Sequence, residues 1–523
     1  MNRAHQEHQE TMPEQAAEQQ RAIIQFLRTP AAYGEPDDAS VQVIETHLAS
    51  VFLVGDKAYK LKRAVKFPFA DFTTLEARRR TCVNELQVNR RFYPDLYVGV
   101  APISRDGSGK LHIGSIRDGE IVDWLVIMHR FDQDQLMENV MGRGEFDDAL
   151  AVECGRMVAA HHASASTAKS DGWGDRLVDI IQRNAWELMN YRDVFQRRTV
   201  SAIGAHTEML ARSQLAQMRD REVDGKVRHC HGDLHLQNMI LVDDGPKAFD
   251  ALEFDDSLAE VDLFYDLAFL LMDLIYRGGA SQANRVLNAY LEETQDYVGL
   301  VQLPLFIATR AIIRAKVSAA QGKADQARAY FDLAAELPRS QPARLIVIGG
   351  LSGTGKSTLA RQIAHQIGDA PGAVHFRSDQ IRKQLYGQPE TTTLPSDAYE
   401  PRVSTAVYQT MANRADAVLA AGRSVILDAV FARPEERAAV EALAKRRNAA
   451  FSGIWLQAAP DIMVTRVKNR VNDASDATPD VVRSQLSYDI GPITWDQFPS
   501  DQEDAASMLA TRVLATVNRT PAE

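Results

Sequence analysis

One eight-residue segment, Gly350 to Ser357, constrains the fold of this chain more than any other feature. It has the spacing G-x-x-x-x-G-K-[ST], follows the apolar run RLIVIGG and precedes a helical pattern. Glycines let backbone N–H groups curl around a phosphate, and a helix N-terminus adds free donors and a favourable dipole. Lys356 is placed to reach the β- and γ-phosphates of a nucleotide, and Ser357 to ligate Mg²⁺. The predicted nucleotide-binding residues here are Gly350, Ser352, Gly353, Thr354, Gly355, Lys356, Ser357 and Thr358.

The sequence that follows this segment alternates strand-like and helix-like patterns. Apolar runs typical of buried strands cover residues 344–350, 373–378, 424–430 and 451–457. Strands that alternate with helices predict a parallel sheet with helices on both faces, so we expect an α/β domain over residues 345–523. The polar, proline-containing stretch ELPRSQPAR, residues 336–344, is the predicted linker before it.

Several charged residues follow these predicted strands, whose carboxyl ends line the ligand crevice of an open α/β sheet. Asp379 is a candidate base for a substrate hydroxyl, although it equally fits a helix N-cap, and Arg382 is a candidate ligand for an acceptor anion. Asp428 ends the third strand and could orient Mg²⁺ or its waters. Arg466 and Arg470 share a helical face and could stabilise charge on a transferring phosphoryl group, with a solvated basic face as the alternative.

Residues 344 to about 517 resemble the small P-loop kinases that include gluconate kinase, zeta toxins and the kinase domain of phage polynucleotide kinase. The resemblance lies in GLSGTGKST, SDQIR and VILDAVF. It implies transfer of the γ-phosphate of ATP to a hydroxyl, with Asp379 as the base and Arg382 as an acceptor ligand. It leaves the acceptor open, because these relatives phosphorylate sugars, nucleotide sugars and polynucleotide ends.

A second group of polar residues lies between His231 and Asp250. The segment HGDLHLQN is followed, after a predicted hairpin, by AFDALEFDD. This spacing is a phosphotransferase arrangement in which Asp233 accepts the proton of the acceptor hydroxyl. Asn238 and Asp250 offer the oxygen ligands that a hard cation such as Mg²⁺ prefers. We expect the histidines beside Cys230 to orient this loop rather than to bind zinc: His229, His231 and His235.

The partners of a kinase site stand upstream in the expected order. SVFLVGDKAYKLKR predicts a β-hairpin that turns at Gly55-Asp56. Lys60 and Lys62 lie on one face of its second strand, and one of them is expected to contact the α- and β-phosphates. Glu85, on a predicted helix over residues 75–92, is the candidate ion-pair partner. Met128 belongs to a strand that enters the interlobe hinge, where adenine would stack.

Residues from about 41 to 333 resemble the aminoglycoside phosphotransferase and choline kinase family, a branch of the protein-kinase-like fold. The resemblance implies a bilobal α+β domain over residues 21–335, with a small sheet-rich lobe before a larger helical lobe. One departure is clear: THLASVFLVGD stands where a G-x-G-x-x-G lid would precede Lys60. The family often tolerates this change by using a polar loop.

Composition limits the remaining possibilities. The 523 residues are 45% hydrophobic and 25% charged, as in ordinary globular proteins, and the net charge of −11 argues against a nucleic-acid partner. The apolar stretch 263–276 contains two aspartates and is too short to span a bilayer. Three scattered cysteines fit a reducing compartment, so we expect a cytoplasmic protein. The polar residues 1–20 are predicted to form a mobile tail, and the oligomeric state stays open.

The sequence therefore predicts an ATP-dependent phosphotransferase with two kinase modules, each using Mg²⁺ and acting on a hydroxyl of a sugar or another small metabolite. GTP in place of ATP stays open. Two alternatives also stay open. In one, a single module is catalytic and the other is a nucleotide-binding regulatory domain. In the other, the P-loop module phosphorylates a nucleotide sugar or a polynucleotide 5′-hydroxyl.

Overall fold

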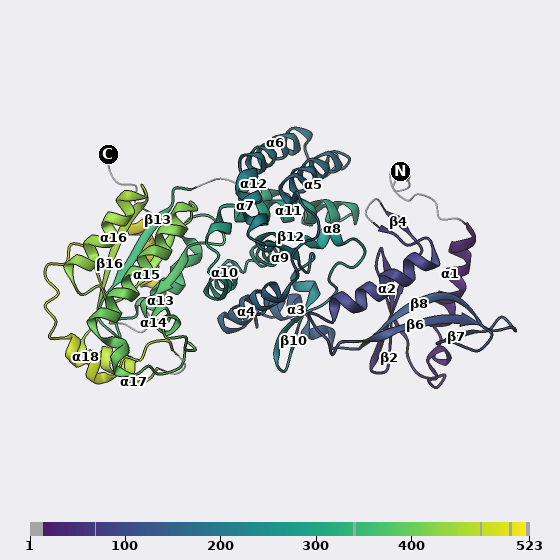
Figure 1. Cartoon of the computed structure of the whole chain (residues 1–523), viewed down its shortest axis with the longest axis horizontal. Coiled ribbons are helices and arrows are strands. Elements are labelled where there is room, and N and C mark those ends of the chain that lie inside the picture. Colours follow the sequence, from purple (N-terminus) through teal and green to yellow (C-terminus); the bar gives the residue numbers. More distant parts are fainter. Residues whose placement is uncertain (1–13, 68–69, 338–340, 471–472, 502–504, 519–523) are drawn as a thin grey trace. The chain divides into compact units, whose positions relative to one another are not determined.

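The chain is described by a computed structural model over residues 14–67, 70–337, 341–470, 473–501 and 505–518. Contacts divide it into two compact units. Unit 1 comprises Met1–Leu150, Ala160–Trp173 and Arg219–Leu267, and unit 2 comprises Ala151–Ala159, Gly174–Met218 and Ala268–Glu523. Figure 1 labels the elements and colours the chain along the sequence.

Unit 1 begins with a six-stranded sheet in the order β1-β2-β3-β8-β6-β7, in which every neighbouring pair is antiparallel. The predicted hairpin is confirmed, since β2 and β3 pair across Gly55-Asp56. No strand was predicted at β6, because Gly99 and Pro102 interrupt its pattern and its register with β8 shifts between Tyr97 and Gly99. The strands are β1 (Gln42–Glu45), β2 (Ala49–Val54), β3 (Lys57–Lys62), β6 (Tyr97–Arg105), β7 (Leu111–Ile113) and β8 (Glu120–His129), with a separate short pair β4 (Lys66–Phe67) and β5 (Ala70–Asp71).

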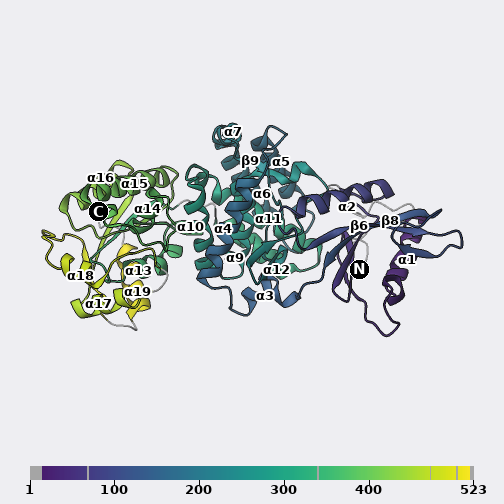
Figure 2. The same ribbon diagram turned by 60° about the horizontal axis from the view of Figure 1, so that its bottom comes forward.

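Two helices accompany this sheet, as Figures 1 and 2 show. Ile23 and Leu27 of α1 (Glu14–Leu27) pack with Phe52 and Leu61, whereas Cys82 of α2 (Leu75–Asn89) packs in a second cluster with Leu53 and Ala58. Both lysines of β3 face α2, because both pair with its Glu85.

The mobile tail predicted over residues 1–20 is wrong for residues 14–20, which belong to α1. The polar side chain of Gln20 is buried: its Nε2 donates to the Lys62 carbonyl (2.9 Å) and to Asp123 (3.1 Å). A glutamine that satisfies backbone groups in this way cannot be told from a solvated one by composition. Residues 1–13 lie outside the described residues.

The remainder of unit 1 surrounds the predicted catalytic loop. β9 (Val227–His229) pairs with β12 (Glu260–Asp262), and β10 (Met239–Val242) forms a hairpin with β11 (Gly245–Ala248). Residues 230–238 therefore connect β9 to β10, and Asp250 follows β11. The accompanying helices are α3 (Met137–Gly142), α4 (Asp148–Ser164), α7 (Leu215–Val223) and α8 (Asp256–Ala259), and α4 and α7 also contribute residues to unit 2.

Unit 2 contains helices before its sheet. They are α5 (Trp173–Leu188), α6 (Arg197–Ser213), most of α9 (Leu263–Tyr276), α10 (Ala280–Thr294), α11 (Leu303–Ala320) and α12 (Ala324–Glu336). α9 is the apolar stretch noted in the sequence, and it is buried along most of its length. Within the described parts of the chain, none of the helices combines the length and apolar character needed to cross a membrane.

The second sheet has the order β14-β15-β13-β16-β17 with all pairs parallel. Its strands are β13 (Arg344–Gly349), β14 (Val374–Arg377), β15 (Val425–Asp428), β16 (Ala450–Gln457) and β17 (Asp496–Pro499). Helices flank it (Figures 1 and 2), and α13 (Lys356–Ile363) and α19 (Ala505–Val517) share one core with Ile346 and Ile426. The predicted α/β fold is confirmed. β17 was not predicted, because its four residues, DQFP, have no apolar run.

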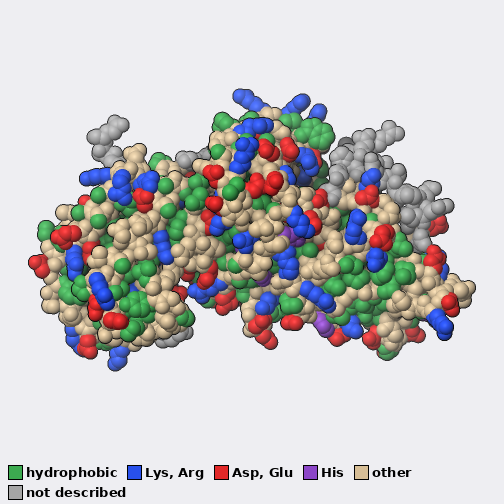
Figure 3. Space-filling model, in the orientation of Figure 1, with side chains coloured by type: hydrophobic (Ala, Val, Ile, Leu, Met, Phe, Trp, Pro, Cys, Tyr) green, Lys and Arg blue, Asp and Glu red, His purple; other side chains and the backbone are tan. Residues whose placement is uncertain are grey.

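Charged side chains of both signs are distributed over the face drawn in Figure 3. Among the described residues on that face, acidic and basic groups are interspersed rather than gathered into one broad basic surface.

Candidate active sites

The phosphate loop connects β13 to α13 in a conformation that its glycines make possible. Gly350, Gly353 and Gly355 have φ values of 139°, 87° and 88°, in the region that L side chains rarely adopt. A Cβ on Gly350 would lie 2.6 Å from the Leu456 carbonyl oxygen, and one on Gly353 would lie 2.5 Å from that of Met463. The backbone therefore closes into a cradle that only glycine allows at these positions.

Lys356 begins α13, and its Nζ donates to the Leu351 carbonyl at 3.1 Å, across the loop. Burial lowers the pKa of this ammonium group, partly offset by Asp428 and Asp379. The Lys356 ammonium group therefore lies over the loop and is poorly solvated. Phosphate oxygens would bind it well, because they would replace the water that it lacks.

Asp428, the last residue of β15, is the acidic centre of this site. Its Oδ2 accepts a hydrogen bond from Ser357 Oγ at 2.5 Å and lies 3.5 Å from His375 Nε2 and 3.8 Å from Arg377 Nε. Burial opposes ionisation, but His375, Lys356 and Arg377 outweigh it and hold the pKa of Asp428 well below its usual range. The Ser357 hydroxyl and an ionised carboxylate fit a Mg²⁺ site, because both are hard oxygen donors.

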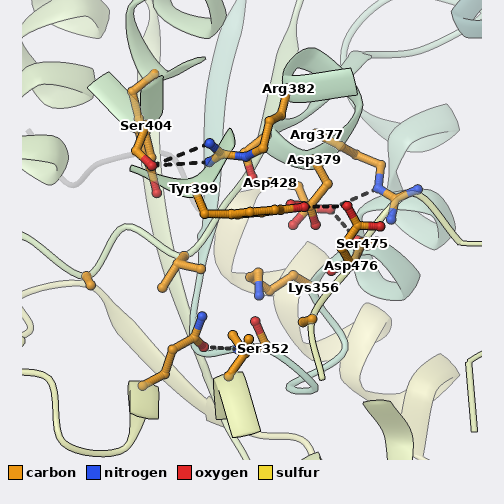
Figure 4. A pocket seen from close by; sticks show the side chains of 18 of the residues that line it. Ser352, Lys356, Arg377, Asp379, Arg382, Tyr399, Ser404, Asp428, Ser475 and Asp476 are labelled. Atoms are coloured by element: carbon orange, nitrogen blue, oxygen red, sulfur yellow. Dashed lines mark hydrogen bonds and ion pairs between the residues drawn. The ribbon is translucent and has the colours of Figure 1, made fainter. Parts of the chain in front are cut away.

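A cleft of about 710 Å³ brings most of the predicted residues of this module together (Figure 4). Its lining includes Ser352, Gly355, Lys356, Ser357, Thr358, Asp379, Arg382, Asp428 and Arg470. Gly350, Gly353 and Thr354 belong to the loop backbone behind it. Arg466, on α17 (Pro460–Lys468), is not among the lining residues: its Nη2 donates to the Ser500 carbonyl at 2.6 Å, and its Nη1 lies 3.5 Å from the Gly353 carbonyl.

Some residues that shape this cleft were not predicted. Arg377 ends β14, one residue before the predicted SDQIR segment, and bonds Asp473 at 2.9 Å. Tyr399, from a short 3-10 helix over residues 396–399, and Asp476, from a loop, line the cleft, and Gln485 accepts from the backbone N–H of Ser352 at 2.8 Å. Arg377 could have been inferred from its place at a strand end. The loop residues have no spacing that would indicate them.

Unit 1 assembles its site from distant segments. Lys60 Nζ of β3 lies 2.8 Å from Glu85 Oε1 on α2 and 2.5 Å from Asp250 Oδ1 after β11. Burial would lower the pKa of Lys60, but Asp250, Glu85 and Glu253 outweigh it and raise that pKa well above its usual value. For Asp250 burial acts in the opposite sense, and the two lysines leave its pKa below its usual value.

Lys62 has a different environment from Lys60. Its Nζ lies 2.6 Å from Glu85 Oε2 and also pairs with Glu253, and its side chain is only 2% exposed. Glu253, three residues after Asp250 in LEFDD, was not predicted as a site residue. Because Lys60 rather than Lys62 contacts Asp250, Lys60 is the lysine with the geometry expected for phosphate binding.

The predicted catalytic loop, residues 230–238, is held by hydrogen bonds within unit 1. Asn238 Nδ2 donates to Asp233 Oδ2 at 2.9 Å, which leaves Asn238 Oδ1 as the atom for a cation. Asp266 accepts from the backbone N–H groups of His231 (3.3 Å) and Gly232 (2.7 Å). Burial lowers the pKa of His231, and its contacts fit the neutral ring with Nε2–H donating to the Phe249 carbonyl at 2.9 Å.

Asp250 itself has a left-handed backbone, with φ of 58°. Its N–H donates to Tyr97 Oη at 3.2 Å, and the next N–H donates to Asn89 Oδ1 at 2.8 Å. Aspartate adopts this conformation more readily than most residues, and here the two hydrogen bonds fix it. Met128 of β8, the candidate adenine contact, is buried in a cluster that contains Ala58 and against which Phe249 packs.

One buried trio in unit 1, His162, Cys230 and Asp266, has atoms close enough to hold a metal ion. Asp266 already accepts hydrogen bonds from the backbone of the predicted catalytic loop, and its Oδ2 lies 3.1 Å from His162 Nε2. Asp266 of this trio therefore holds the backbone of the loop, and His229, His231 and His235, the histidines singled out in the sequence, are not members of it.

Comparisons with known proteins match the two stretches of the chain that contain these sites. Residues 49–300 match the model of the "Phosphotransferase enzyme family", and residues 345–488 match the model of an "AAA domain". Uncharacterized proteins of Mycobacterium tuberculosis (strain H37Rv) and Mycobacterium bovis are each 30% identical over 481 residues, covering 88% of this chain and 93% of theirs.

Solved structures are similar to parts of the chain. Choline kinase from Cryptosporidium parvum is 14% identical over 61% of this chain and 95% of its own, with a TM-score of 0.39. A sugar kinase from Janibacter sp. HTCC2649 is 20% identical over 34% of this chain and 97% of its own, with a TM-score of 0.25.

Fold, sites and family models define a protein with two kinase-like domains: a phosphotransferase domain of the aminoglycoside phosphotransferase type and a P-loop kinase domain. With 30% identity over nearly the full length of both chains, this chain belongs to the same two-domain family as the mycobacterial proteins.

Proposed function

We propose that both domains are catalytic and that each transfers the γ-phosphate of ATP to a hydroxyl of a small molecule. One observation supports this most: in each site a carboxylate suited to Mg²⁺ already contacts a second group of the same predicted machinery, a phosphate-binding lysine in unit 1 and a second Mg²⁺ ligand in unit 2. These pairs are Lys60 with Asp250 (2.5 Å) and Ser357 with Asp428 (2.5 Å).

In unit 1, Lys60 would bind phosphate oxygens while Glu85 fixes its direction. Asn238 and Asp250 would hold Mg²⁺, which when bound neutralises charge on the phosphates. Asp233 would accept the proton as the acceptor oxygen bonds to the γ-phosphorus and the bond to the β-phosphate oxygen breaks, releasing ADP. The hydrogen bond from Asn238 keeps the Asp233 carboxylate oriented toward that proton.

In the phosphate-loop site, the glycine backbone and Lys356 would hold the phosphates, and Ser357 with Asp428 would hold Mg²⁺. Asp379 lies in the first turn of α14 (Ser378–Leu385) and would accept the proton of this site's acceptor hydroxyl. The acceptor oxygen would bond to the γ-phosphorus as the bond to the β-phosphate oxygen breaks, releasing ADP. Arg470 borders the cleft and would face the charge of the transferring phosphoryl group.

One observation favours the alternative that unit 1 binds nucleotide without turning it over. The turn between β1 and β2, where a glycine-rich lid stands in many kinases, is Thr46-His47-Leu48 and has no glycine.

The test separates the sites by substitution. Asp233→Ala and Lys356→Ala should each remove a different ATP-dependent phosphorylation, by about a thousandfold, when radiolabelled ATP is incubated with a metabolite mixture and the full-length chain. Glu76→Ala, an exposed glutamate of unit 1, and Arg402→Ala, an exposed arginine of unit 2, are the controls. Unchanged transfer in the double variant would reject the proposal, and loss of a single activity in only one variant would favour the binding-only alternative.

A further inference from the structure

An exposed aromatic ring in the phosphate-loop cleft has no part in the transfer described above. Tyr399 ends the short helix η6 (Ser396–Tyr399), is 41% exposed, and lines the same cleft as Lys356 and Asp379 (Figure 4). A large aromatic surface that stays wet inside a cleft is typical of a ligand contact rather than of a core residue.

One face of this ring is already covered. The guanidinium carbon of Arg382 lies 4.8 Å from the ring centroid, a cation–π distance, and Arg382 itself is 7% exposed. Arg382 Nη1 donates to the Ala398 carbonyl at 2.6 Å. Arg382 therefore covers one face of the ring, and although both residues line the cleft, Figure 4 draws Lys356 on the opposite side of the ring from Arg382.

The hydroxyl end of the ring is fixed as well. Tyr399 Oη donates to Asp476 Oδ2 at 2.5 Å, and the same carboxylate accepts from the buried Lys383 ammonium at 2.6 Å and from the Leu394 N–H at 3.0 Å. Burial and the Asp476 carboxylate raise the pKa of the Tyr399 phenol, so it stays a donor. The ring is thus held in place before any acceptor arrives, which reduces the entropy that binding would cost.

We propose that Tyr399 is the acceptor-binding wall of this module, and that it selects a cyclic hydroxyl acceptor with an uncharged ring face, a monosaccharide or a nucleoside, over an open-chain one. The inference rests on the proposed function of this site. A sugar ring or a base packs flat on an aromatic face, whereas a flexible chain gains less contact and loses more freedom on binding. Arg382 is then a positioning residue that acts through Tyr399, in place of the direct acceptor ligand expected from the sequence.

Matched probes test the preference for a ring. The full-length chain with Asp233→Ala, which silences the other site, is assayed with labelled ATP and the pairs D-glucose/sorbitol and D-ribose/ribitol, with adenosine as the nucleoside arm. At least one cyclic sugar should have a kcat/KM about tenfold above that of its open-chain partner, or adenosine should have a kcat/KM about tenfold above that of ribitol. Whether the labelled phosphate is found on a sugar or on adenosine distinguishes a monosaccharide acceptor from a nucleoside acceptor. Equal or better use of the open-chain probes, or no labelled cyclic probe, would overturn the proposal.

Substitutions on the same background test the residue. Tyr399→Ala should raise the KM of the cyclic probe by about tenfold with the KM for ATP unchanged, while Tyr399→Phe, which keeps the ring, should stay within about threefold. Arg382→Leu should raise the same KM with kcat nearly kept, and Arg382→Lys should restore it. Leu385→Ala, an exposed residue of α14 outside the cleft lining, is the control.

An unchanged KM in Tyr399→Ala would refute the role of the ring, even if ATP turnover still depends on Lys356. Absence of any Lys356-dependent ATP turnover would instead refute the proposed function of the site, so the two failures are distinguishable.

Discussion

The two candidate sites hold phosphate-binding groups in opposite ways. In unit 2 they come from one contiguous stretch of eight residues, and the backbone does most of the binding. In unit 1 Lys60 meets Asp250 across 190 positions of sequence, and buried ion pairs among side chains hold the site. The contiguous site should therefore be sensitive to small changes in backbone shape, whereas the assembled site should be sensitive to the loss of one charge.

The largest effect is expected at Glu85. Its side chain is fully buried between Lys60 and Lys62, so Glu85→Ala leaves two buried ammonium groups with fewer partners and should cost about 3 kcal/mol of stability in unit 1. Hydrogen exchange of peptides from β3 and α2 measures that loss. Glu76→Ala, on the exposed side of the same helix, is the control. Equal protection from hydrogen exchange in the two variants would contradict the claim that buried ion pairs hold this site.

A smaller but more local effect is expected at Gly353. A Cβ there meets the Met463 carbonyl at 2.5 Å and the backbone has φ of 87°, so Gly353→Ala should weaken binding of a nonhydrolysable Mg·ATP analogue at this site by about tenfold or more. Gly387→Ala has a similar φ of 62° but open space around its Cβ, and it controls for backbone strain alone. Equal affinities of the two variants for the Mg·ATP analogue would show that the close approach of the Met463 backbone does not shape the loop.

The smallest effect concerns pH in unit 1. Burial and His231 lower the pKa of His161 to about 4, below its unfolded value, so the neutral form is favoured in the fold. Stability contributed by this burial is present above pH 6.5 and is lost as the pH falls toward 4, by about 1–2 kcal/mol between pH 7 and pH 5. His161→Gln should flatten this decline in denaturation curves of unit 1, and the exposed His47→Gln should leave it unchanged. A decline that persists in His161→Gln would assign it to other groups.

Features carried by contiguous stretches of the sequence were also the ones that could be predicted. The α/β fold of the C-terminal module followed from one loop motif and four apolar runs, whereas β17 was missed because a short edge strand needs no apolar run. In the N-terminal module, the alternation of β3 put Lys60 and Lys62 on one face but could not separate them. Only the positions of Asp250 and Glu253 in the fold make that distinction.

Residues that depend on loop geometry were out of reach. Tyr399 and Asp476 are 77 positions apart, one at the end of the short helix η6 and the other in a loop, so nothing in their spacing pairs them. Gln20 was assigned to a mobile tail because a buried amide and an exposed one have the same composition. Side-chain hydrogen bonds between distant segments are set by tertiary packing, which a local pattern does not contain.

The most direct test of the account is the number of nucleotide sites on one chain. Calorimetric titration of the full-length protein with a nonhydrolysable Mg·ATP analogue should give two sites per chain, one removed by Lys60→Met and the other by Lys356→Met. A single site, or two sites that both persist in either variant, would contradict the claim that this chain builds two separate phosphate-binding centres.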